Sequence, residues 1–581
     1  MPKTMRIPDS AVDRAAYVID SQDVTGKFAA AMGFSARGRP RTLPFRSFLI
    51  GGLLAVQWEG EFKATVIHRV LTEGLSYAKQ RELGVRYPDK NGDMQVINTG
   101  KLYSLTRRMD ERMAYGRLSA PDLDEAERER RRQALQDLID AILDGSLIGK
   151  GTGWYALDAS GLWGWSKKPY RKTEDVPDVR RTDDDSPEPE QTPDTGVPAS
   201  PTDDQHADES ATEGDPAAED GTSTADDSSK RRKRSEPTYD VDAAVGYKTA
   251  KFGERETFFG FLLDAAVRVT PPGEGSAPMV AERIVVSPAN ADCVEPSLTM
   301  LDSIIAKGTR VTDICVDRDY SYKKVERWAS ELRRRRINQH LDLRSGEQGF
   351  RDYNGLKVAA GWMHCPATPF ELGHIPRPGP NATEKARKEF RRNIDKRQSY
   401  AMARIERTNG DGRARWQCPA LEGRIGCPLR EGTVEAARAG GLPIVDNPPD
   451  IEHAPKCCTN SGGTVATRYE KQQKHEQPHY WGSHEWKAAY DRRTFVEGFF
   501  GSLKNPDAED LHRGSTRFTG LPKVSLSVAF AVAATNIRHQ RKWWAKRDGK
   551  PDHPLLSEDP PSLGWTELTQ EQLDALDRDA R

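Results

Sequence analysis

The first 150 residues carry apolar side chains at the spacing of helices. Such runs cover residues 61–83, 101–115 and 122–145, and the last run ends at a glycine. Apolar positions that recur about every 3.6 residues form one face of a helix, and glycine is a common helix stop. The pattern predicts a helical N-terminal domain over residues 1–150.

Beyond this domain, short apolar runs of strand type alternate with helical runs. Strands are expected at 153–158, in a hairpin over 240–269, and at 281–290, 311–317 and 337–343. Helices are expected at 296–308 and 322–336. Short apolar runs bounded by turn residues favour strands, whereas longer periodic runs favour helices. The order predicts a mixed α/β core in which helices pack on a sheet.

A further helical run, residues 484–504, carries an unusual set of polar side chains. It has no proline, and Tyr490, Arg493, Glu497 and Lys504 return to one face of a single helix. One interpretation is an amphipathic helix with a solvated salt-bridge face. The other is a metal-binding Glu497 whose neighbours hold phosphates, because a half-buried carboxylate needs a partner.

Two aspartates follow predicted strands further upstream. Asp158 ends the strand at 153–158 and precedes a turn of small residues at 159–161. Asp317 ends the strand at 311–317, and Asp319 stands two residues further on. An aspartate at such a point is either a turn cap or a metal ligand held by a rigid element. We favour Asp317 over Asp319 as the ligand because Asp317 directly terminates the apolar strand.

Together these residues resemble one known family. The spacing Tyr-x2-Arg-x3-Glu-x6-Lys over residues 490–504 resembles the signature of a group of DDE transposases from bacterial insertion sequences. The stretch Asp-Arg-Asp-Tyr at 317–320 is similar to the motif around the family's second acid, where glycine usually stands in place of Asp319. The resemblance implies a ribonuclease-H-like core with a mixed five-stranded sheet, and an insertion subdomain before the helix that bears Glu497.

The resemblance also implies a chemistry and its partners. Asp158, Asp317 and Glu497 would be catalytic and would bind two Mg²⁺ (or Mn²⁺) ions, for which carboxylate oxygens are suitable ligands. The enzyme would bind the terminal inverted repeats of its mobile element as double-stranded DNA. It would cleave there and join the 3′ ends to target DNA as a homodimer or larger oligomer. The alternatives are a catalytically silent DNA-binding protein derived from a transposase, and a ribonuclease-H-like nuclease without strand transfer.

The expected DNA contacts are basic or phenolic side chains near the core or in basic loops: Tyr490, Arg493, Lys504, Arg513, Arg517, Arg39 and Arg41. By resemblance, the first three would bind phosphates near the cleaved bond, arginine as a fork and lysine as a point charge. Arg39 and Arg41 belong to the segment ARGRPR, which can lie in a minor groove. A solvated basic loop is the alternative for that segment.

The charge of the chain is unevenly distributed. The 581 residues have a net charge of −1, with 36% hydrophobic and 30% charged residues. Residues 174–237 are rich in Asp, Glu, Pro, Ser and Thr and contain no aromatic residue. Such a segment cannot offset its ordering entropy by burial, so we expect a disordered acidic linker. The near-neutral average therefore does not argue against a nucleic-acid partner.

The expected segments are 1–150, a helical DNA-binding or dimerisation domain; 151–173, the first core strand; 174–237, the acidic linker; 238–343, the first half of the core; 344–483, a cysteine-bearing insertion; 484–547, the Glu497 helix and a closing helix; and 548–581, a peripheral C-terminal tail.

The seven cysteines do not indicate a disulfide scaffold in so long a chain. Cys418, Cys427, Cys457 and Cys458 are candidate ligands of a structural zinc ion, and free reduced thiols are the alternative because the usual Cys-x2–4-Cys spacing is missing. No apolar run in the sequence is long enough to span a bilayer. We therefore expect a cytoplasmic, nucleoid-associated bacterial protein without membrane contact.

Overall fold

The computed structural model describes residues 6–34, 43–166, 239–249, 255–379 and 381–559. Three expectations lie outside these residues: the minor-groove contacts Arg39 and Arg41, the acidic linker at 174–237, and the far end of the C-terminal tail, residues 560–581.

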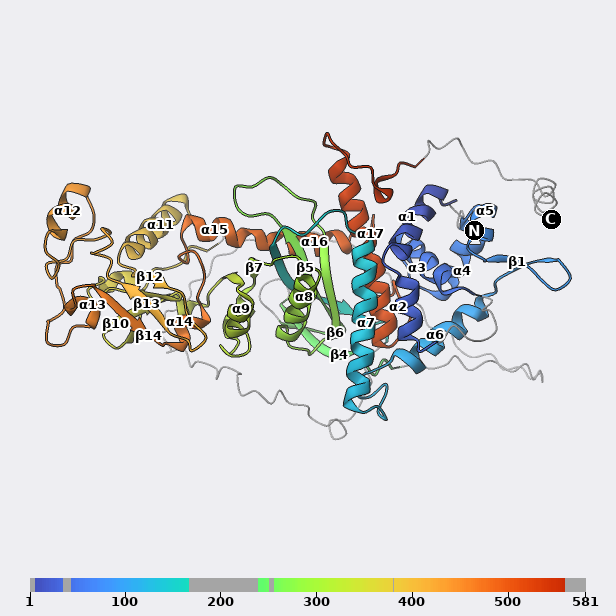
Figure 1. The fold of residues 1–581 in the computed structure, drawn as a ribbon, viewed down its shortest axis with the longest axis horizontal. Helices are drawn as coiled ribbons and strands as arrows, with labels where there is room; N and C mark the ends of the chain where they lie inside the picture. The colour runs from blue at the N-terminus through green and yellow to red at the C-terminus, as the bar shows by residue number, and fades with distance from the viewer. Residues whose placement is uncertain (1–5, 35–42, 167–238, 250–254, 380, 560–581) are drawn as a thin grey trace, which may run out of the picture. The chain divides into compact units, whose positions relative to one another are not determined.

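A mixed sheet forms the centre of the fold (Figure 1). Its strands are β3 (Trp154–Trp163), β4 (Ala244–Thr249), β5 (Arg255–Val269), β6 (Ala281–Pro288), β7 (Asp313–Val316) and β8 (Asn338–Leu341). The path β6-β5-β3-β7-β8 combines antiparallel pairs on the β5 side of β3 with parallel pairs on the β7 side. The predicted hairpin supplies β4 as a sixth strand, which pairs with the first part of β5. This mixed sheet with its helices is compatible with the expected ribonuclease-H-like core.

Strand β3 is longer than the sequence pattern predicts. The expected turn at 159–161 is instead strand, because β5 extends far enough to pair with β3 as far as Trp163. The glycine at position 161 is needed for close packing and not for a turn, because a Cβ atom there would lie 2.9 Å from the ring of Phe258. Asp158 is therefore inside β3 and does not end it.

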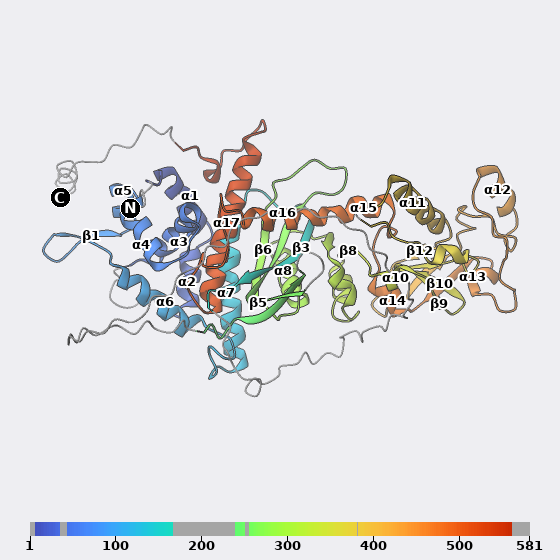
Figure 2. The same cartoon turned by 180° about the vertical axis from the view of Figure 1, so that it is seen from behind.

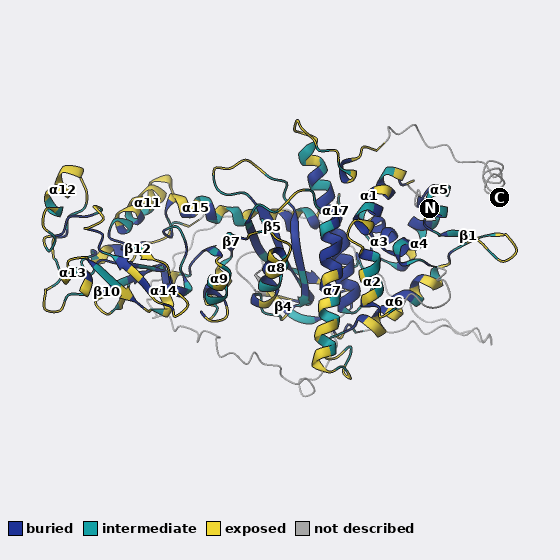
Figure 3. Cartoon of the chain, viewed as in Figure 1, coloured by how far each residue is buried: buried dark blue, intermediate teal, exposed yellow. Residues whose placement is uncertain are grey.

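Helices pack on the sheet and complete the predicted order. After β6 and β7 come α8 (Val294–Ala306), a short 3-10 helix (Arg318–Tyr322) and α9 (Ala329–Arg335). The later elements are α15 (His484–Tyr490), a 3-10 turn (Asp491–Arg493), α16 (Thr494–Leu503) and α17 (Leu521–Trp544). Helix α16 contacts β3 and β5, and α17 contacts β6. Most of α17 is buried, as the sequence predicts for the closing helix (Figure 3).

The N-terminal region is helical, as predicted. It contains α1 (Asp9–Asp20), α2 (Val24–Ala31), α3 (Phe45–Glu59), α4 (Ala64–Arg69), a π-helical turn (Val70–Gly74), α5 (Tyr77–Glu82), α6 (Thr99–Met113) and α7 (Glu125–Gly145), with a small hairpin of β1 (Arg86–Pro88) and β2 (Met94–Val96). Helices α3, α6 and α7 contact α17, and α7 also contacts β6 (Figures 1 and 2). These helices share one continuous apolar core with α16, α17 and the sheet.

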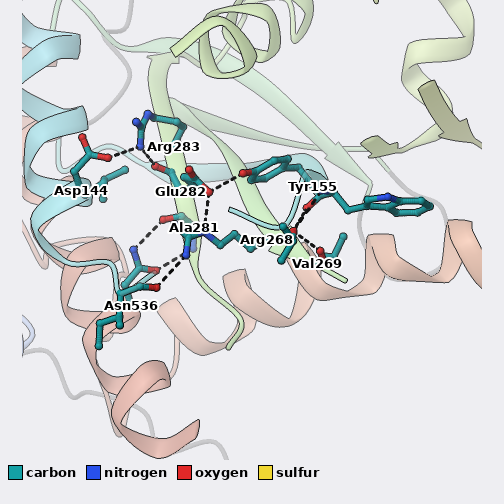
Figure 4. Close-up of polar contacts among 12 residues, drawn as sticks. Asp144, Tyr155, Arg268, Val269, Ala281, Glu282, Arg283 and Asn536 are labelled. Atoms are coloured by element: carbon teal, nitrogen blue, oxygen red, sulfur yellow. Dashed lines mark hydrogen bonds and ion pairs between the residues drawn. The ribbon is translucent and has the colours of Figure 1, made fainter. Parts of the chain in front are cut away.

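A buried polar network fixes this helical layer to the sheet (Figure 4). Asn536 of α17 exchanges two hydrogen bonds of 2.9 Å with the backbone of Ala281 on β6. On the same strand, Arg283 pairs with Asp144 of α7 at 3.0 Å. Amide and ion-pair contacts of this kind satisfy polar groups that burial would otherwise leave without partners.

The segment between β8 and α15 forms a subdomain of small elements: α10 (Ser345–Gln348), β9 (Arg351–Tyr353), β10 (Leu356–Ala359), β11 (Trp362–His364), α11 (Glu384–Ser399), β12 (Ala403–Glu406), β13 (Ala414–Gln417), α12 (Thr433–Gly440), α13 (Lys456–Thr459), β14 (Thr464–Thr467) and α14 (Glu470–Lys474). Its strands form two three-stranded antiparallel sheets, β11-β10-β9 and β12-β13-β14. Two small apolar clusters of its own lie within it.

The described part of the C-terminal tail is not peripheral, in contrast to the expectation. Leu555 and Leu556 are buried, and Asp559 forms an ion pair of 2.7 Å with Arg14 of α1. Two adjacent apolar side chains supply the burial that a purely polar tail would lack. In the part of the chain that the structure describes, no helix combines the length and apolar character needed to cross a membrane.

Candidate active site

The segment with the four signature residues is two helices rather than one. Helix α15 ends at Tyr490, a single 3-10 turn covers Asp491–Arg493, and α16 begins at Thr494. The Thr494 hydroxyl donates to the backbone oxygen of Asp491 at 2.8 Å, which is a side-chain alternative to a regular helical bond. The break leaves Arg493 and Glu497 one turn apart on the same side.

The register of the sheet brings Asp158 and Asp317 to the same level. Strands β3 and β7 run parallel, with Ala156 opposite Cys315, and their pairing stops there. Two residues beyond this last pair stand Asp158, still on β3, and Asp317, directly after the end of β7. Neighbouring residues at equal positions on parallel strands lie side by side, so the two carboxylates meet where the strands separate.

One guanidinium joins the strand to the helix. Arg493 Nη1 lies 3.1 Å from Asp158 Oδ2, and its Nη2 lies 2.5 Å from Glu497 Oε1. The ring of Tyr490 lies 6.0 Å from the same guanidinium and stacks on Trp486. The structure thus brings together Asp158, Asp317, Glu497, Arg493 and Tyr490 from elements far apart in the sequence.

The carboxylates of this cluster outnumber its one guanidinium, so its net charge is negative. Burial, and then the charge of Asp317, raise the pKa of Asp158 to about 6. Burial also raises the pKa of Asp317, with the charge of Asp319 as a further contribution. The Arg493 guanidinium lowers both pKa values but does not offset these effects. Mutually repelling carboxylates at a partly buried site are the condition that a bound cation relieves.

The donor set fits a hard divalent cation. The carboxylates of Asp158 on β3 and Glu497 on α16 contact the same guanidinium, and Asp317, directly after β7, interacts electrostatically with Asp158. As a group the three carboxylates are farther than 4.8 Å from one another. Mg²⁺ prefers carboxylate oxygens and keeps several of its waters, so it does not require a closed cage of protein ligands. Asp319 has a different setting: its side chain is 59% exposed and lies 3.2 Å from Lys323.

Lys504 directly follows α16 and contacts β3 beyond Asp158. Its ammonium donates to Ser160 Oγ at 2.7 Å and to the backbone oxygen of Gly161 at 3.0 Å. Together with Arg513 it lines a cavity of about 330 Å³. Arg513 and Arg517 are both exposed in the loop between α16 and α17. The two predicted basic groups of this loop are therefore accessible from solvent.

Two residues near the site were not singled out from the sequence. Trp165 lines the cavity beside Lys504, is 42% exposed, and has the Arg517 guanidinium 4.7 Å above its ring. Asp264 on β5 is buried, and burial raises its pKa well above the ordinary value, with a further contribution from Asp158. The repeated tryptophan and glycine residues at the end of β3 could have indicated Trp165 from the sequence. Asp264 carried no signal because it lies within an apolar strand run.

Comparison with known families matches residues 453–540 to the transposase DDE domain. The matched part contains Tyr490, Arg493, Glu497 and Lys504, and it does not reach Asp158 or Asp317. No curated protein and no solved structure matches the chain.

Proposed function

We propose that this chain is a DDE transposase of the bacterial insertion-sequence type, because residues 453–540 match the transposase DDE domain. It binds the ends of its mobile element, cleaves DNA there and transfers the 3′ ends to target DNA. The observation that carries the proposal is that Arg493 joins Asp158, outside the matched residues, to Glu497, inside them, with Asp317 close enough to Asp158 to raise its pKa.

Asp158, Asp317 and Glu497 are the proposed ligands of two Mg²⁺ or Mn²⁺ ions. When bound, such ions would activate the attacking oxygen and stabilise the leaving oxygen of an in-line displacement at phosphorus. The raised pKa values of Asp158 and Asp317 support this assignment, since they report uncompensated negative charge. Asp317 is preferred to Asp319, whose carboxylate is exposed and already pairs with Lys323.

The cations of the site are assigned to the DNA. Arg493 contacts two of the three carboxylates, so it is placed to hold a phosphate next to them through a bidentate pair of N–H groups. Tyr490 and Lys504 bind neighbouring phosphates, one through a hydroxyl and one as a point charge. Arg513 and Arg517 extend this basic surface along the exposed loop. Trp165 offers an aromatic face on which an unpaired base can stack.

The partners follow from the reaction. The substrate is double-stranded DNA with the terminal inverted repeats of the element, and the second substrate is target DNA. Both ends must be joined in one event, so the active form is a homodimer or larger oligomer on DNA. A nucleoid-associated, cytoplasmic setting in a bacterium is the corresponding expectation.

The decisive experiment is an in vitro assay with DNA that carries the inverted repeats flanking the coding region. Wild-type protein with Mg²⁺ is expected to nick at the repeat ends and, with target DNA added, to yield joined products. Glu497→Ala is expected to lower both by on the order of 10³-fold, because one of the proposed metal ligands is lost. Glu485→Ala is the matched control, since Glu485 is an exposed acid in the first turn of the neighbouring α15.

Each outcome has a defined consequence. Undiminished cutting by Glu497→Ala overturns the assignment of the site. Cutting without joined products, sensitive to Glu497→Ala, identifies a nuclease without strand transfer. Specific binding of the repeats without cutting under any divalent metal identifies a silent DNA-binding protein derived from a transposase.

A further inference from the structure

The insertion between β8 and α15 gathers five of the seven cysteines, all of them free thiols: Cys365, Cys418, Cys427, Cys457 and Cys458. Cys365, Cys418 and Cys427 belong to one buried cluster, together with Tyr400. Cys457 and Cys458 lie in α13. The thiols of Cys365 and Cys427 both lie close enough to Cys418 and Cys458 to interact electrostatically with them.

Three of these cysteines share the same local sequence, in which each directly precedes a proline: Cys365, Cys418 and Cys427. Cys365 directly follows β11, and Cys418 directly follows β13. Burial raises the pKa of the Cys365 and Cys427 thiols, and a backbone N–H two residues on, that of Ala367 or Leu429, counteracts part of this rise in each case.

Hydrogen bonds connect the remaining elements to this cluster. The backbone N–H of Cys418 donates to Gly463 O at 2.8 Å, in the turn after α13. Arg430, three residues after Cys427, donates to the backbone oxygen of Cys457 at 2.6 Å. The Arg430 guanidinium also lies near the Cys458 sulfur. A cation beside the cluster offsets part of the negative charge that four thiolates around one divalent ion leave.

We propose that Cys365, Cys418, Cys427 and Cys458 form a structural zinc site. This set replaces the sequence-based one by exchanging Cys457 for Cys365. Cys457 is 2% exposed inside an apolar cluster with Leu356, Met363 and Trp416, whereas Cys458 is only partly buried at the edge of that cluster, beside Arg430 and close enough to Cys427 to interact with it electrostatically. Zinc takes four sulfur ligands at about 2.3 Å in a closed tetrahedral site.

A second group of metal-type side chains in this subdomain is not proposed as a metal site. Among the described residues, Asp450, Glu452 and His453 are the one group of metal-type side chains with all ligand atoms within 4.8 Å of one another, and all three are exposed. The thiol sulfurs are farther apart than that as a group, so zinc would draw them together. Its role is to join the ends of the two small sheets, because β11 and β13 each lead into one ligand. A small subdomain with short strands gains stability from such a cross-link.

The test is the zinc content of the purified full-length protein, measured by plasma mass spectrometry after growth with added zinc. Wild type is expected to contain about one zinc per chain. Cys365→Ser is expected to contain at least about fivefold less, because a structural site needs its fourth ligand. Cys293→Ser is the matched control, since Cys293 precedes α8 outside the insertion, and Cys457→Ser is the control for ligand choice. Both controls are expected to keep the zinc of the wild type.

Cobalt supplies a second measurement that does not depend on a soluble variant. Wild-type protein reconstituted with Co²⁺ is expected to show the sulfur-to-cobalt charge-transfer absorption of a tetrahedral thiolate site. Metal-free wild type with all seven thiols reactive overturns the proposal. Loss of zinc in Cys457→Ser with retention in Cys458→Ser overturns the choice of the fourth ligand. The measurement needs no DNA, so its result is independent of the proposed transposase activity.

Discussion

Strand β3 carries two charged clusters a few residues apart, and they are built on opposite principles. At Tyr155, the carboxylate of Glu282 accepts the tyrosine hydroxyl at 2.8 Å and the Arg268 Nε at 2.7 Å (Figure 4). The two side chains of this ion pair are each only 6% exposed. Near Asp158, one guanidinium contacts two of three neighbouring carboxylates, and the site is partly exposed, with the Glu497 side chain 50% accessible to solvent. The first cluster is closed and balanced, and the second is open and acidic.

The difference separates structural charge from functional charge. A buried ion pair is tolerated only when each charge has partners, because desolvation costs several kcal/mol per ion. The Glu282 cluster meets that condition with protein groups alone. The Asp158 cluster does not, and burial and repulsion raise the pKa of Asp158 to about 6. The proposed cation would supply the missing partner.

The largest effect is expected from Asp158→Asn. Cleavage should fall by on the order of 10³-fold, because an amide is a poor substitute for a metal-binding carboxylate. Stability without metal should rise, since the substitution removes a repelled, desolvated charge. DNA cleavage and urea unfolding of the same preparation test both halves. A variant that loses activity by unfolding would place Asp158 with the structural cluster.

Glu282→Gln is expected to lower stability while leaving cleavage nearly unchanged, the opposite of Asp158→Asn. Arg268 would keep its buried charge without a counter-ion, which costs about 3–5 kcal/mol of unfolding free energy. Cleavage measured well below the unfolding transition should stay within a few-fold of the wild type. Glu274→Gln, in the exposed loop after β5, is the matched control and should be neutral. Unchanged stability of Glu282→Gln in urea unfolding would show that the balanced cluster is not structural.

The pH dependence of stability sharpens the comparison further. The pKa of Asp158 is about 6 in the folded protein, against an ordinary 3.8. Between these values the folded state binds more protons than the unfolded state, so stability falls as pH rises through this window. Without divalent metal, wild type should lose up to about 3 kcal/mol relative to Asp158→Asn between about pH 4 and pH 6.

Thermal unfolding in a chelator, at several pH values and for both proteins, measures this difference. Mg²⁺ added at neutral pH should raise the Tm of the wild type and not that of Asp158→Asn, because a ligand that binds only the folded state stabilises it. Parallel pH profiles for the two proteins would contradict the raised pKa.

The sequence predicted the elements of this site better than their details. The apolar patterns correctly predicted the sheet strands, the helical N-terminal region and the buried closing helix α17. The extension of β3 past Asp158 was missed, because the small residues at 159–161 are equally typical of a turn. Only the pairing with β5 and the ring of Phe258 explain why this stretch is extended.

The tertiary contacts of the site could not be predicted from local pattern. A single helix from 484 to 504 would place Arg493 and Glu497 on one face, and the two helices separated by a 3-10 turn keep that pair together. That Arg493 also reaches Asp158, across more than three hundred residues, depends on how α16 packs on β3. The same limit applies to Cys365, which the sequence spacing separates from the other cysteines of its cluster.

The smallest expected effect distinguishes two aspartates of one loop. Asp319→Asn should change cleavage by less than about threefold, because an exposed ion pair contributes under about 1 kcal/mol. Its carboxylate pairs with Lys323 at 3.2 Å and faces solvent, whereas Asp317 directly follows β7 and is close enough to Asp158 to raise the pKa of its carboxyl. Asp317→Asn is therefore expected to lower cleavage about as far as Asp158→Asn does. The comparison needs only initial rates at saturating Mg²⁺. The reverse ranking of the two variants would move the second metal ligand to Asp319 and shift the open cluster one turn along the loop after β7.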